Sequence, residues 1–128
     1  MIAFSPAFIN PALVSKITVQ KKEKKMLKII VLYPQPSDTA KFEKDYEAHL
    51  RLLHEKTGIP INVKPYKITK MLPTPAGLPQ FYKMFSMPFS SLEELQATMS
   101  TQAMQDVAKD AQRISTGGLP VTMVGDED

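Results

Sequence analysis

The sequence predicts an α+β protein with elements in the order β-α-β-β-α-β, the ferredoxin-like arrangement. Three observations support this prediction: one long amphipathic segment, four strand-like stretches between turn residues, and a pair of helix-capping boxes ahead of the last stretch. Because crossovers within one sheet are right-handed, both helical regions are expected on one face of a four-stranded antiparallel sheet.

The amphipathic segment is Phe42–Lys56, whose apolar side chains gather on one side at about 100° per residue. Ser37 or Asp38 can cap its start by accepting backbone N–H bonds, and Gly58 is suited to end it. One polar residue, His49, lies near the middle of the apolar stripe. The segment is therefore predicted to be a helix that buries a histidine.

Strands are expected where β-branched and aromatic residues run between turn residues. The four stretches are Leu27–Tyr33, Ile61–Leu72, Gln80–Phe89 and Leu119–Gly125. Pro65 interrupts the second stretch and has no backbone donor, so that strand is expected at a sheet edge or a bulge.

Two overlapping Ser-x-x-Glu capping boxes open the second helical region. They are Ser90 with Glu93 and Ser91 with Glu94. Ser100 or Thr101 can begin a further helical stretch with apolar residues at helical spacing. Gly117–Gly118 is expected to form its C-cap.

The chain of 128 residues, 43% of them hydrophobic, is long enough for one domain with a core. Residues 1–25 differ from the remainder, because they contain Pro6 and Pro11 and end in a lysine-rich run. We expect residues 26–128 to form the domain and residues 1–25 to be an accessory arm or an over-extended gene start.

Composition argues against several partners. Six of the sixteen basic residues fall within residues 1–28, and the remaining ten stand against twelve acidic ones, a net of −2 without a basic stripe. Nucleic-acid binding is therefore not predicted. No apolar run approaches the roughly 18 residues of a membrane span. The absence of cysteine is compatible with a reducing compartment, so the cytoplasm is the expected location.

The first strand is apolar in both of its alternating phases. Ile29, Val31 and Tyr33 would face one side of the sheet, and Ile30 and Leu32 the other. Helices on a single face would leave the second apolar set uncovered. We therefore predict a homodimer through the open sheet face, with apolar cavities inside it.

Two runs of residues, one in each half of the domain, form a further pattern. They contain Tyr33-Pro34, Phe42, Tyr46 and His49-Leu50, and then Phe89, Ser91, Leu92, Leu95, Asp110 and the glycine pair. Over nearly all of residues 26–127 the chain resembles the EthD family of dimeric α/β-barrel proteins, named from ethyl tert-butyl ether degradation. His49 is the position that the resemblance carries over most directly. Arg51 stands where the family often has proline, which leaves the helix uninterrupted.

His49 is the main candidate for chemistry, since histidine titrates near neutral pH. Asp45, four residues earlier, could form an oriented acid–base pair with it. The alternative is a core histidine satisfied by a carbonyl or by Asp45. We expect His54 to be an ordinary surface histidine, and Lys83 and Asp110 to be solvated.

Phenol groups are the candidate ligand contacts, because a few polar groups in an apolar surround orient small ligands. They belong to Tyr33, Tyr46, Tyr66 and Tyr82. For each of them, packing with the hydroxyl at a rim is the alternative. Neither metal nor organic cofactor is predicted, because the glycines lack phosphate-loop spacing and the two histidines lack a convergent carboxylate set.

Two functions of different classes stay open. The first is a binding module for a small hydrophobic metabolite, which the resemblance links to an oxidative pathway such as ethyl tert-butyl ether degradation. The second, also implied by the resemblance, is a cofactor-independent monooxygenase or cyclase acting on an aromatic, polyketide-like substrate with His49 as acid/base. The fold alone does not choose between them.

Overall fold

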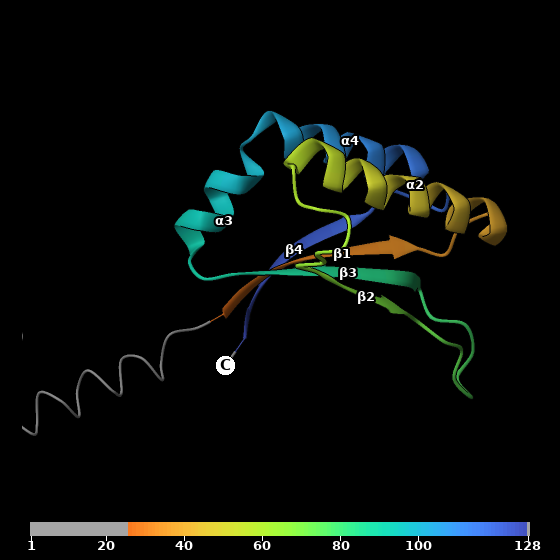
Figure 1. Cartoon of the computed structure of the whole chain (residues 1–128). Helices are drawn as coiled ribbons and strands as arrows, with labels where there is room; N and C mark the ends of the chain where they lie inside the picture. The colour runs from red at the N-terminus through yellow and green to blue at the C-terminus, as the bar shows by residue number, and fades with distance from the viewer. Residues whose placement is uncertain (1–25, 128) are drawn as a thin grey trace, which may run out of the picture.

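The computed structural model describes residues 26–127 and contains a four-stranded antiparallel sheet with three helices over one face (Figure 1). The strands are β1 (Met26–Pro34), β2 (Lys67–Lys70), β3 (Phe81–Phe89) and β4 (Val121–Glu127). The helices are α2 (Thr39–Thr57), α3 (Leu92–Met99) and α4 (Gln102–Ile114). The predicted fold class is confirmed; the predicted arm over residues 1–25 lies outside the described residues.

The strand order is β2-β3-β1-β4, so β1 and β3 occupy the centre of the sheet. In register, Ile29 pairs with Met87 and Val31 with Phe85, and these side chains face the helices. The opposite face carries apolar side chains of three strands. They are Ile30, Leu32, Met84, Val121 and Met123. No helix or strand among residues 26–127 covers that face (Figure 1).

Helix α2 forms as predicted. The side chain of Asp38 accepts a hydrogen bond from the backbone N–H of Lys41, and Gly58 ends the helix in the left-handed region at φ 79°. Its buried residues include Phe42 and His49. The helix lies beside α4, so the two together cover the sheet (Figure 1).

The second helical region is two helices, each with a side-chain cap. Ser91 caps α3 by accepting from the backbone of Glu94, while the Glu94 carboxylate accepts from the backbone of Ser90. Thr101 caps α4 by accepting from the backbone of Met104. Of the two predicted capping boxes, the one beginning at Ser91 is therefore the one that starts a helix.

Two predicted boundaries are wrong. The strand expected over Ile61–Leu72 is reduced to β2, because Pro65 cannot donate to a ladder, although its predicted edge position is confirmed. Helix α4 ends with Ser115 as C-cap, not with the glycine pair. Gly117 instead allows a close chain approach, since a Cβ there would lie 1.8 Å from the backbone oxygen of Gln35.

None of the helices in the described part of the chain is long and apolar enough to cross a membrane.

Candidate functional site

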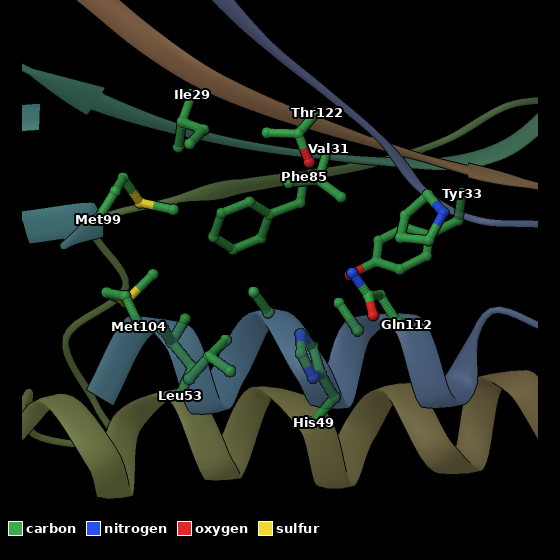
Figure 2. A pocket seen from close by; sticks show the side chains of 14 residues that line it. Ile29, Val31, Tyr33, His49, Leu53, Phe85, Met99, Met104, Gln112 and Thr122 are labelled. Atoms are coloured by element: carbon green, nitrogen blue, oxygen red, sulfur yellow. The ribbon is translucent and has the colours of Figure 1, made fainter. Parts of the chain in front are cut away.

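A cavity of about 110 Å³ lies between the sheet and the helices (Figure 2). Most of its wall is apolar. The apolar lining residues include Ile29, Val31, Leu53, Phe85, Met99 and Met104, and the polar ones are Tyr33, His49, Gln112 and Thr122. The exposed lining residues Ala108, Gln112 and Thr122 lie on α4 and β4, so the cavity opens between these two elements.

This cavity is distinct from the cavities predicted inside a two-sheet dimer, which stay a prediction. It lies on the helix-covered face, within one chain. The physical reason is the small size of the side chains that α4 directs at the sheet. Ala108 and Ala111 leave space there that larger side chains would fill.

His49 reaches the cavity from α2 and is held by α4. Its Nδ1 lies 2.8 Å from Oδ2 of Asp110, and the other carboxylate oxygen of Asp110 accepts from Nε of Arg113 at 2.8 Å. The second ring nitrogen, Nε2, has no hydrogen-bond partner among residues 26–127. One nitrogen is therefore fixed by a carboxylate, and the other is available to a ligand.

Burial determines the charge of this pair. Only 5% of His49 is exposed, and burial lowers its pKa below the usual 6.5 although the Asp110 carboxylate acts in the opposite direction. Burial acts to raise the pKa of Asp110, but hydrogen bonds from His49 and Arg113 outweigh it and hold that pKa below its usual range. A neutral imidazole that donates from Nδ1 to Asp110 keeps a lone pair on Nε2.

The predicted partner of His49 is wrong. The carboxylate of Asp45 binds Nζ of Lys41 at 2.7 Å, on the outer side of α2. Asp110 takes its place, and it is not solvated as predicted, since 16% of its side chain is exposed. Helical spacing offered a signal for this residue, because Asp110 lies next to the buried stripe of α4, one turn from Val107 and Ile114.

The four candidate tyrosines do not form one site. Tyr33 lines the cavity, and its hydroxyl has no hydrogen-bond partner in the described part of the chain. The Tyr66 hydroxyl instead forms a hydrogen bond of 2.7 Å with Nε2 of His54. Nδ1 of His54 lies 3.1 Å from the Ile59 carbonyl oxygen. His54 is therefore buried, and the prediction of a surface histidine is wrong, because the segment after α2 folds over it.

The other two tyrosines lie at an ion pair outside the cavity, in which the lysine is buried and the glutamate is partly exposed. Nζ of Lys83 binds Glu43 at 2.7 Å and lies 4.6 Å from the centroid of the Tyr46 ring, while the Tyr82 hydroxyl donates to Glu43. Lys83 is 6% exposed, so its predicted solvation is wrong. The Tyr46 hydroxyl is buried without a partner among the described residues. This cluster fastens α2 to β3.

Metal-binding groups are absent from this part of the chain: no three His, Cys, Asp or Glu side chains within residues 26–127 could hold a metal ion together.

One solved structure decides the family. An EthD family protein from Bacillus halodurans C-125 is 33% identical to this chain, with a TM-score of 0.67, and the match covers 80% of this chain and 99% of that one. The chain belongs to the EthD family. Within this EthD-family chain, α2 continues through Arg51 to Thr57 as a single helix, as the residue at that position led us to expect.

Two more distant structures share the fold. An EthD-like protein from Ralstonia eutropha JMP134 is 22% identical, with a TM-score of 0.50 and coverage of 80% and 91% of the two chains. A dimeric protein of unknown function from Bacteroides fragilis NCTC 9343 has a ferredoxin-like fold, 11% identity, a TM-score of 0.55 and coverage of 79% and 95%. No family model and no curated protein matches the EthD-family chain.

Proposed function

We propose that this EthD-family protein binds a small, mainly apolar molecule in the cavity and that His49 accepts a proton from it. The observation that carries the proposal is the geometry of one side chain. Asp110 fixes Nδ1 of His49, and Nε2 is left without a protein partner in an apolar wall. A base held in this way can remove a weakly acidic proton from a bound ligand.

The size of the cavity limits the ligand. A cavity of about 150 Å³ accommodates benzene, so about 110 Å³ limits the enclosed part of a ligand to no more than a single ring. Gln112 and Thr122 stand at the opening, where a larger polar substituent could extend toward solvent. Family membership supports a link to an oxidative degradation pathway, such as that of ethyl tert-butyl ether.

The orientation of His49 favours a catalytic role over a role in ligand binding alone. Proton removal is the first step shared by cofactor-independent oxygenation and cyclisation of activated phenols and carbonyl compounds, and the unpartnered Nε2 of His49 supports a role in that step. A module that only holds an apolar ligand gains little from a buried histidine–carboxylate pair, because burying polar groups costs stability.

Binding and proton transfer can be tested with 4-nitrophenol, a single-ring acid whose anion absorbs at longer wavelength than the neutral form. We expect the wild type to bind a larger fraction of it as the anion than His49→Gln does. Ala108→Phe at the cavity opening should abolish binding, whereas Ala48→Phe on the exposed side of α2 should not. Binding that survives in Ala108→Phe would place the ligand elsewhere.

We also propose that two copies associate through the open sheet face. The support comes from the apolar side chains of β1, β3 and β4 on that face and from the relative described as dimeric. Met123→Glu should then convert a dimer to a monomer in native mass spectrometry. Val63→Glu is the matched control, because Val63 is 46% exposed, against 45% for Met123, but lies off the sheet. A monomeric wild type would contradict this proposal.

A further inference from the structure

Tyr33 is the second polar group in the deep part of the cavity. It is 2% exposed, it extends from β1 on the wall opposite α2, and its hydroxyl has no hydrogen-bond partner among residues 26–127 (Figure 2). The oxygen is not fully buried, because among residues 26–127 only the Tyr46 hydroxyl is both fully buried and unpartnered, so a molecule in the cavity can reach the Tyr33 hydroxyl and supply a partner. The cavity lining around it includes apolar atoms of Val31 and the polar side chain of Gln112, which lies toward Tyr33 in Figure 2.

Tyr33 and His49 belong to the same end of the cavity. Both rings pack against Tyr46, whose ring centroid lies 5.5 Å from that of Tyr33 and 5.8 Å from that of His49. In Figure 2 both lie toward Gln112, away from Met99 and Met104. A ligand of single-ring size at this end could therefore meet the phenol and the imidazole together.

The two groups have complementary hydrogen-bonding roles. Burial, with a smaller contribution from the negative charge of Asp110, raises the pKa of Tyr33, so its phenol stays protonated and can donate. The neutral His49 offers a lone pair at Nε2 and can only accept. A donor and a base on separate side chains match a ligand with an acceptor atom beside an acidic C–H.

We propose that the ligand is a single-ring-sized, enolisable ketone, with the Tyr33 hydroxyl bound to the carbonyl oxygen while His49 removes a proton from the adjacent carbon. This inference rests on the proposed function of His49. In the step, the α C–H bond breaks and its proton moves to Nε2. The electron pair forms the C=C bond of an enolate, whose oxyanion is stabilised by the Tyr33 O–H. The imidazolium exchanges its Nε2 proton with solvent and then protonates the α carbon, which restores the ketone and the neutral imidazole. No oxidant or reductant is needed.

An ether lacks this combination, because its oxygen activates no neighbouring C–H as an acid. A phenol could engage both protein groups through its single oxygen, donating to His49 and accepting from Tyr33, but it has no α C–H to exchange. The arrangement therefore disfavours an ether, and exchange of α-hydrogens with solvent is the observation that distinguishes a bound ketone from a bound phenol.

The experiment follows exchange of the α-hydrogens of cyclohexanone in D2O by proton NMR, with the full chain. We expect exchange above the buffer rate in the wild type, none above it in His49→Gln, and a rate about 100-fold lower at saturation in Tyr33→Phe, with little change in KM. Tyr46→Phe is the matched control. It removes a buried hydroxyl next to both rings and outside the cavity lining, and should exchange at the wild-type rate.

The outcomes separate the two proposals. Equal exchange in Tyr33→Phe and the wild type would overturn the role of Tyr33, and a wild type without exchange would overturn the ketone. If exchange persisted unchanged in His49→Gln, the proposed base itself would be wrong. Thermal unfolding of Tyr33→Phe, which keeps the ring and its packing, distinguishes a lost hydroxyl from a misfolded variant.

Discussion

Replacement of Asp110 by alanine tests the pair on which the site depends. The substitution leaves the buried Nδ1–H of His49 without its acceptor at 2.8 Å. An unsatisfied buried donor costs about 1–3 kcal/mol. Arg113 also loses its partner, but it is exposed and regains water, so it adds little. We therefore expect the free energy of unfolding to fall by about 2 kcal/mol.

For a domain of this size, a loss of about 2 kcal/mol corresponds to a fall in Tm of roughly 10 °C. Circular dichroism melting and urea denaturation at pH 7 measure it. Asp106→Ala is the matched control, since Asp106 lies one turn earlier on α4 and also pairs with a side chain of α2, Lys56, but at the surface. If the Tm of Asp110→Ala fell no more than that of Asp106→Ala, the buried pair would not have the role given to it here.

Three further predictions concern other parts of the molecule. Glu43→Ala should lower the free energy of unfolding by about 3 kcal/mol, because it leaves the buried ammonium of Lys83 without a partner. Lys83→Met should lower it by only about 1 kcal/mol, since Glu43 can reach water. Equal losses for the two variants in urea denaturation would contradict this asymmetry. Gly117→Ala should cost about 3 kcal/mol, because its Cβ would meet the Gln35 backbone oxygen, and an unchanged Tm would count against that packing. Burial lowers the pKa of His49 in the folded chain, against the opposing effect of Asp110 and with a smaller contribution from Arg113. The unfolded chain therefore binds more protons than the folded chain below about pH 6.5. Stability should therefore fall as the pH drops below that value, and urea midpoints of His49→Gln should show a weaker dependence.

Local patterns predicted the fold well because each element carries its own boundary residues. Helix α2 begins at its Asp38 cap and ends at Gly58, and Ser91 and Thr101 cap the later helices. Where a boundary depends on another part of the chain, prediction was wrong. Gly117 resembled a C-cap, but it is needed for contact with Gln35, a residue more than eighty positions earlier.

The site was predictable only in part for the same reason. His49 was identified from its place in the apolar stripe, but its partner Asp110 is 61 residues away and depends on how α2 and α4 pack. Asp45 had the right spacing within one helix and proved to bind Lys41. The burial of Lys83 likewise follows from rings and a carboxylate that only the folded chain brings together.

The most direct test of the central claim is a long-range proton–nitrogen NMR spectrum of the His49 imidazole at neutral pH, before and after addition of cyclohexanone. We predict a neutral ring protonated at Nδ1, with an Nε2 signal that shifts when the ketone enters the cavity. A ring protonated at Nε2 would contradict the assignment of His49 as an oriented base, and an Nε2 signal that does not respond to the ketone would contradict the ketone as its ligand.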